Sequence, residues 1–336
     1  MPLRQSIESQ EFESPIMGAL KLTQKQTIPP EKYLRPNESG ETIDRMCVDS
    51  DSDLLVLTFN SPGRVRTLSL SNQELHTQDV YVCNHTGDIL GLGYVKATGT
   101  LLVYSSEPDD DSLLKDRLVT FAREGNSFNL KLQEKIEHEN SRKRKVQFCE
   151  LYDAKVLTGN CYINSNMLTQ NLYLFKVGHT HQIGLKHHIQ VPEPFYWFDA
   201  KVIADHGTLV ALTHHSHISL YEIKNAQLTL NKLYRLSINY PTQVLWCGKC
   251  LFVGSRKNSQ RLSAISLSGN TLKITTDVQV PDSSIVSASE KQLAFLSGVK
   301  GVRFCSIKGV PPFHPTPPPM SPSLGTLHRR LSIPNT

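Results

Sequence analysis

The chain has 336 residues, of which 39% are apolar and 20% are charged, and its formal net charge is +5. This composition is typical of a folded globular protein and excludes a largely disordered one, while the charge is too small for a dedicated nucleic-acid-binding domain. There is no run of 18 apolar residues and no apolar core of a signal peptide at the N-terminus, so we expect an intracellular protein without a membrane span, in the nucleus, the cytoplasm or both.

The first 17 residues are polar and contain two prolines, which predicts a flexible N-terminus over residues 1–17. The next segment, ALKLTQKQTI at residues 19–28, has the pattern of a single strand. It resembles the segment NTLKITTDVQV at residues 270–280, because both run from a glycine through Leu-Lys and threonine to an apolar residue and a proline.

Helical periodicity is almost absent from the rest of the chain. Short runs of Val, Ile, Leu, Tyr and Phe alternate instead with Gly, Asn, Asp and Ser, which is typical of strands and turns. Six stretches repeat one form, an apolar strand, a polar turn and a second strand, at steps of 42 to 54 residues. These hairpins lie at residues 53–70, 100–124, 155–177, 208–223, 250–267 and 292–307.

Each hairpin is preceded by a short apolar strand, and the first five are also followed by a fourth strand. The preceding strands are IDRMCV, ILGLGYV, VQFCELY, YWFDAKVI, QVLWC and SIVSAS. The sixth hairpin ends at SIKGVPPF, where prolines prevent another strand. We therefore expect residues 19–28 to supply the missing fourth strand.

The predicted fold is all-β: a six-bladed β-propeller over residues 18–308, closed by an N-terminal strand that completes the last blade. A seven-bladed propeller is the alternative. In architecture the chain resembles the WD40-like β-propeller superfamily. The Trp-Asp pair of that family is replaced by LYEI near Tyr221, LYLFKV near Tyr173 and LVTFAR near Val119, and its Gly-His pair is not recognisable. The resemblance therefore implies the shape and no functional residues.

Two charged loops lie between these strands. SRKRKV at residues 141–146 gathers Arg142, Lys143, Arg144 and Lys145, which predicts a nuclear-import signal or a phosphate-contacting patch. EPDDDS at residues 107–112 is acidic, and we expect an exposed turn there rather than a calcium site.

Three further motifs invite a chemical interpretation. CGKC at residues 247–250 has no second ligand pair for zinc, so we expect a hairpin turn with a buried thiol pair. FYWF at residues 195–198 is expected to start a first strand and to pack in the core. The histidines are expected in turns or on the surface, with His215 and His217 on one strand face; the full set is His179, His181, His187, His188, His214, His215 and His217.

The last segment, residues 309–336, is rich in proline and serine, which predicts a disordered, extended tail. Thr316 and Ser321 each precede a proline, and Ser332 follows a basic pair, so all three are candidate phosphorylation sites and the chain is a candidate phosphoprotein.

No nucleophile elbow, phosphate-binding loop or HExxH zinc motif is present, and the inner strands carry almost no carboxylates apart from Asp44 and Asp199. We therefore expect no enzyme, no cofactor and no metal. The favoured function is a non-catalytic protein-interaction scaffold in an intracellular, preferably nuclear, multiprotein complex, with other proteins as partners and no membrane contact. The alternatives are a non-catalytic partner of an RNA- or DNA-acting enzyme such as a tRNA methyltransferase, which would contact nucleic acid, and a small-molecule enzyme that uses the central channel.

Overall fold

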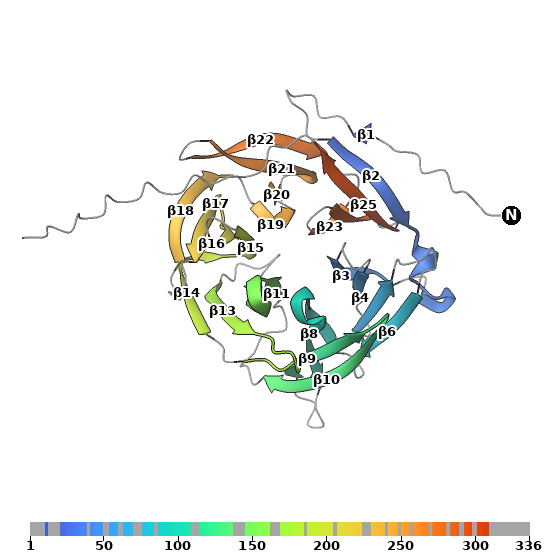
Figure 1. Ribbon diagram of the computed structural model, residues 1–336. Coiled ribbons are helices and arrows are strands. Elements are labelled where there is room, and N and C mark those ends of the chain that lie inside the picture. Colours follow the sequence, from blue (N-terminus) through green and yellow to red (C-terminus); the bar gives the residue numbers. More distant parts are fainter. Residues whose placement is uncertain are drawn as a thin grey trace, which may run out of the picture.

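The computed structural model of the protein is built almost entirely of β-strands (Figure 1). It describes residues 11–12, 21–38, 41–49, 54–59, 63–69, 76–83, 87–108, 114–136, 145–161, 169–184, 187–203, 207–223, 230–238, 241–247, 250–255, 258–268, 271–279, 283–288, 292–297 and 301–308. Within these ranges the helical elements are short 3-10 turns: η1 (Pro30–Lys32), η2 (Pro36–Glu38), η4 (Lys96–Thr98) and η5 (Tyr152–Ala154). None of the helical elements described is long and apolar enough to cross a membrane.

The strands form five sheets, and three of these are antiparallel sheets of four strands in chain order. The first contains β3 (Ile43–Asp49), β4 (Leu54–Phe59), β5 (Arg64–Ser69) and β6 (His76–Val82). The second contains β15 (Trp197–Ile203), β16 (Gly207–Thr213), β17 (His217–Ile223) and β18 (Leu230–Ser237). The third contains β19 (Pro241–Cys247), β20 (Cys250–Ser255), β21 (Asn258–Ser268) and β22 (Thr271–Gln279).

The eight-stranded sheet consists of two four-stranded antiparallel units joined edge to edge. One unit is β7 (Asp88–Val95), β8 (Thr100–Pro108), β9 (Leu114–Glu124) and β10 (Ser127–Ile136). The other is β11 (Lys145–Glu150), β12 (Lys155–Cys161), β13 (Thr169–Lys176) and β14 (His187–Phe195). The joint is a short parallel pairing of β7 with β11, in which Gly91 lies opposite Val146 and Leu92 opposite Gln147.

The fifth sheet brings the two ends of the strand-forming chain together. It has the order β1 (Glu11–Phe12), β2 (Lys21–Ile28), β25 (Gly301–Lys308), β24 (Gln292–Ser297), β23 (Ser283–Ala288). The predicted placement of residues 19–28 beside the last hairpin is confirmed for residues 21–28, the part that the structure describes, because β2 pairs antiparallel with β25 from Lys21–Lys308 to Ile28–Val302. β1 lies within the segment predicted to be flexible, and it adds a short outer strand to β2.

The sheets stand around a common centre, with the first strand of each unit innermost and the fourth outermost (Figure 1). The innermost strands contact one another in succession: β3 with β7, β7 with β11, β11 with β15, β15 with β19, β19 with β23, and β23 with β3. The structure therefore confirms a nearly all-β, propeller-like architecture built from antiparallel four-stranded units.

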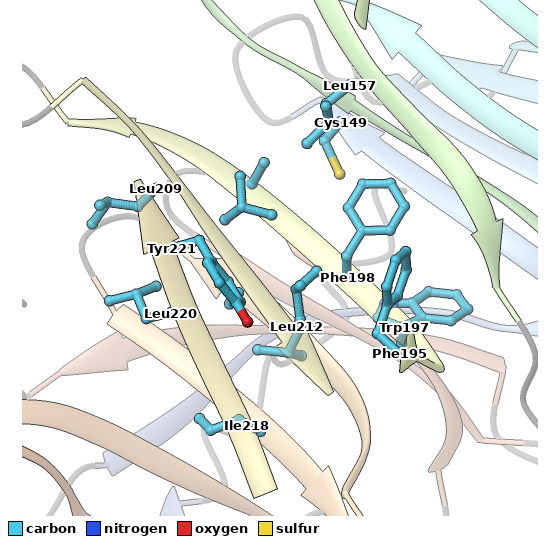
Figure 2. Packing of buried hydrophobic residues seen from close by; sticks show 14 of the residues in the cluster. Cys149, Leu157, Phe195, Trp197, Phe198, Leu209, Leu212, Ile218, Leu220 and Tyr221 are labelled. Carbon is cyan, nitrogen blue, oxygen red and sulfur yellow. The ribbon is translucent and has the colours of Figure 1, made fainter. Parts of the chain in front are cut away.

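Apolar side chains fill the spaces between neighbouring sheets. One large cluster packs Phe195, Phe198 and Tyr221 with aliphatic residues of β12, β16 and β17, as Figure 2 shows, and it continues to Val244 and Val253 of the sheet formed by β19 to β22. A second cluster joins the first and last sheets, because Phe59 and Leu57 pack with Val302 and Phe304. The strands are buried on both faces there, which explains their nearly continuous apolar runs.

Three expectations about local structure are corrected. The sequence HQIGLKHHIQV at residues 181–191 predicts the fourth strand of the third unit, but this strand runs from His187 to Phe195, so FYWF spans the end of β14 and the start of β15. Pro192 and Pro194 are tolerated there because β14 is an edge strand, so its outward-facing backbone positions need no N–H to donate to another strand. Glu107, expected in an exposed turn, is 1% exposed and accepts hydrogen bonds from Tyr81 and Ser105.

Candidate functional site

Two groups of titratable side chains lie between neighbouring sheets and are candidate sites. One is on the inner strands around Asp199, and the other is at the rim between β14 and the β16–β17 hairpin. The sequence pointed to single residues of each group but to neither constellation, because their members come from different units of the fold.

Asp199 links three consecutive inner strands. It lies on β15, and its Oδ1 accepts hydrogen bonds from the Cys149 thiol of β11 at 3.2 Å and from the Ala200 N–H at 2.9 Å. Its Oδ2 accepts from the backbone N–H of Trp246 on β19 at 2.7 Å. Burial raises the pKa of Asp199 to about 6 in spite of these three donors. A carboxyl group that titrates near neutral pH is able to exchange a proton, but its donors here also hold adjacent sheets together.

Asp44, the second inner-strand carboxylate expected from the sequence, also joins two units. Its Oδ1 lies 2.6 Å from the Lys145 Nζ at the start of β11, and neighbouring Arg45 donates to the Val146 carbonyl at 3.1 Å. Lys145 is thus the one described member of the predicted basic patch, and its charge is paired with Asp44. Arg142, Lys143 and Arg144 lie outside the described residues, so the import or phosphate-contact role stays a prediction.

The second group contains two histidines that flank one hairpin turn. The expectation that His215 and His217 share a strand face is wrong, because β16 ends at Thr213 and the chain turns at residues 215–216. His214 and His217 are therefore hairpin partners: the His214 N–H donates to the His217 carbonyl at 2.8 Å, and their rings stack with centroids 4.3 Å apart. Both are buried, at 4% and 6% exposure, whereas His215 is exposed.

Glu193 of β14 completes this group from the adjacent unit. Its Oε2 lies 3.1 Å from the His217 Nε2, and the carbonyl of the next residue, Pro194, accepts from the His214 Nδ1 at 2.7 Å. One ligand atom each from Glu193, His214 and His217 lies within 4.8 Å of the others. Arg235 of β18 donates to the His217 Nδ1 at 3.1 Å. A buried pair of imidazoles beside a carboxylate is a set of groups able to hold a transition-metal ion.

The structure also places the CGKC motif and two further histidines, but not the candidate phosphorylation sites. Cys247 and Cys250 are partners at the ends of β19 and β20, as expected for a hairpin turn, and Cys247 is buried as a thiol. The candidate phosphorylation sites Thr316, Ser321 and Ser332 lie outside the described residues and stay predictions. His181 lies in a turn and its Nδ1 contacts the Thr100 hydroxyl at 2.8 Å. The His188 ring lies tilted against Tyr173, with ring centroids 5.4 Å apart.

No protein-family model matches this chain, and no curated protein sequence matches it. Solved structures do match in fold. A chain in the crystal structure of the mitotic checkpoint complex is similar at a TM-score of 0.51 and 10% identity, over 91% of this chain and 98% of that one. That likeness supports a propeller-like fold, while membership of the WD40-like superfamily is not shown.

Two enzymes are also among the similar structures. One is titled glucose dehydrogenase, with a TM-score of 0.49 and 12% identity over 85% of this chain and 98% of that one. The other is titled putative oxidoreductase (glucose dehydrogenase) and comes from Thermus thermophilus, with a TM-score of 0.48 and 10% identity over 80% and 100%. The expectation that the chain is not an enzyme is withdrawn, because a missing motif does not exclude catalysis and a fold does not decide whether a protein is an enzyme. At this identity the matches transfer no activity.

Proposed function

We propose that the chain is a closed six-bladed propeller that acts as a protein-interaction scaffold within an intracellular multiprotein complex. Six four-stranded units support this blade count, the last one being completed by β2, and the succession of contacts among the innermost strands supports closure. Closure of this kind leaves the outer strands and the loops as the surface on which other proteins bind.

The observation that carries this proposal is that the inner-strand carboxylates connect different units of the fold. Asp44 joins β3 to β11, and Asp199 joins β15 to β11 and β19. Both groups hold units of the scaffold together, so binding is assigned to the outer surface. The fold-level likeness to a chain from the mitotic checkpoint complex agrees with such a role, because that chain also works inside a protein assembly.

The experiment is native affinity purification of the tagged full chain, followed by size-exclusion chromatography and cross-linking mass spectrometry. We expect one or more proteins to co-elute in a fixed ratio, with cross-links to lysines of the outer strands such as Lys131 of β10 and Lys176 of β13, which are 37% and 51% exposed. The same chain without residues 309–336 tests whether the tail contributes. Elution of the chain alone, without reproducible cross-links to another protein, would contradict the scaffold role.

A further inference from the structure

The geometry points to a metal site that is separate from the scaffold role: we propose that Glu193, His214 and His217 bind one zinc-class divalent ion. Two imidazole nitrogens and one carboxylate oxygen form the donor set that suits Zn²⁺ and its neighbours, whereas Ca²⁺ and Mg²⁺ require oxygen ligands. Three protein ligands leave the fourth tetrahedral position to water or another ligand.

His214 is already oriented as a ligand. Its Nδ1 lies 2.7 Å from the Pro194 carbonyl, and only a protonated Nδ1 can donate to that oxygen. The lone pair of the ring is therefore on Nε2. A backbone carbonyl that fixes the tautomer and orientation of a ligating histidine is the usual outer contact of zinc sites. Because this carbonyl belongs to the residue after Glu193, one short stretch of β14 supplies both a ligand and the group that positions another ligand.

The ligand atoms lie close enough together to reach one ion, but one imidazole ring must reorient. Bonds of about 2.0–2.1 Å in a tetrahedral site place neighbouring ligand atoms about 3.3 Å apart. The His217 Nε2 and the Glu193 Oε2 are already 3.1 Å apart, and the full set lies within 4.8 Å. The two imidazole planes are within 12° of parallel, so one ring must turn before both lone pairs point at the same ion.

The ring that turns is His217, and Arg235 controls it. Arg235 donates to the Nδ1 of His217, so without metal the proton of this ring is on Nε2 and points to Glu193. When Nε2 binds the ion, the ring proton moves through solvent to Nδ1 and faces the Arg235 N–H, which must withdraw. Arg235 is exposed and is able to swing outward. It therefore competes with the ion both as a donor and as a positive charge.

The test is a Zn²⁺ titration of the metal-stripped full chain, monitored by calorimetry and by competition with a chromophoric chelator. We expect one ion per chain and a loss of affinity of about tenfold or more for Glu193→Gln, His214→Ala and His217→Ala. The matched control is His215→Ala, which removes the exposed histidine of the same turn and should leave the affinity unchanged.

The decisive variant is Arg235→Gln, which keeps a polar side chain and removes the competing charge. We expect it to bind Zn²⁺ several-fold more tightly, because the variant removes both the competing donor to the His217 Nδ1 and a positive charge close to a divalent ion. This gain does not depend on whether the ligand variants fold. No uptake by the unchanged chain, affinity that depends on His215 instead of His214 and His217, or an Arg235→Gln variant without tighter binding would each overturn the proposal.

Discussion

Asp199 shows how burial and hydrogen bonding compete at a single carboxyl group. Three donors favour its anion, yet burial dominates and the pKa rises to about 6 from an ordinary value near 4. The folded chain therefore holds a proton on Asp199 between about pH 4 and 6 that the unfolded chain has already lost. By linkage, this group makes the folded state less stable as the pH rises through that range.

We predict that Asp199→Asn removes this pH dependence. A shift of about two pKa units corresponds to about 3 kcal/mol as an upper bound. The unchanged chain should lose up to that much stability, relative to the variant, as the pH rises from about 4 to about 7. The reason is that the buried Asp199 carboxyl must ionise in the unchanged chain, whereas the amide that replaces it in the variant does not ionise. Urea unfolding at a series of pH values measures this difference. A difference that stays constant with pH would show that Asp199 is not protonated in the folded state at pH 5.

Glu38 shows the opposite shift. Its carboxylate lies 2.8 Å from the Arg66 Nη1 and 2.8 Å from the Arg64 Nη1, and the hydrogen bond from Arg66 is the main cause that lowers its pKa to about 2. The two guanidinium groups also lie over the ring of Phe59. Because the pKa is depressed, the stabilisation is complete above about pH 4.5 and is lost as the pH falls towards 2.

We predict that Glu38→Ala lowers the free energy of unfolding at pH 7 by about 1.5–3 kcal/mol, because it removes charge-assisted hydrogen bonds to two nearly buried arginines, of which Arg64 keeps Glu41 and Arg66 keeps Asp79. Equilibrium unfolding in urea measures the loss. Glu31→Ala, an exposed residue seven positions earlier, is the matched control and should change stability by no more than about 0.5 kcal/mol. Equal effects of the two substitutions would mean that this ion-pair cluster contributes nothing specific.

At the level of elements, the parallel joint between β7 and β11 depends on the absence of side chains at two glycines. A Cβ on Gly93 would lie 2.5 Å from the Cβ of Phe148, and one on Gly91 would lie 2.9 Å from the carbonyl oxygen of Val146. The close approach of the two strands is what merges two units into one eight-stranded sheet.

We predict that Gly93→Ala destabilises the protein by about 1–3 kcal/mol, because the added methyl must push β11 and Phe148 away. Thermal unfolding followed by circular dichroism measures the effect. Gly178→Ala is the control, since a Cβ there meets nothing closer than 3.8 Å. If Gly93→Ala is as stable as this control, the joint is looser than the structure shows.

The strands could be predicted from the sequence, whereas the candidate sites could not, and the difference has a physical reason. Strand positions follow from local alternation of apolar and turn residues, so β3, β16 and the Cys247–Cys250 hairpin lie where the sequence predicts them. The two candidate sites do not follow from local pattern, because Glu193 meets His217, and Cys149 meets Asp199, across different units. Only the pairing of His214 with His217 around a two-residue turn was within reach of the sequence. The expectation that His215 and His217 share a strand face misplaces the turn of the predicted hairpin at residues 208–223, which falls at residues 215–216.

At the level of the whole molecule, the pairing of β2 with β25 connects the two ends of the strand-forming chain. Ile28 is 1% exposed and packs with Val302 in the cluster between the last and first sheets. Gly301 has φ +82°, and a Cβ there would lie 2.1 Å from the Ile28 carbonyl oxygen. The turn into β25 is therefore shaped around the end of β2. Without β2, β25 would present an unpaired edge, which invites aggregation.

We predict that two N-terminal truncations behave differently. A chain that begins at residue 18 loses β1 but keeps β2, and should unfold cooperatively at a midpoint within a few degrees of the full chain. A chain that begins at residue 30 loses β2 as well, and should aggregate or unfold without cooperativity because the β25 edge and the residues around Val302 become exposed. Size-exclusion chromatography and thermal unfolding distinguish the two. A cooperative, monomeric chain that begins at residue 30 would show that the fold does not depend on closure by β2, and the proposed six-bladed ring would then have to be abandoned.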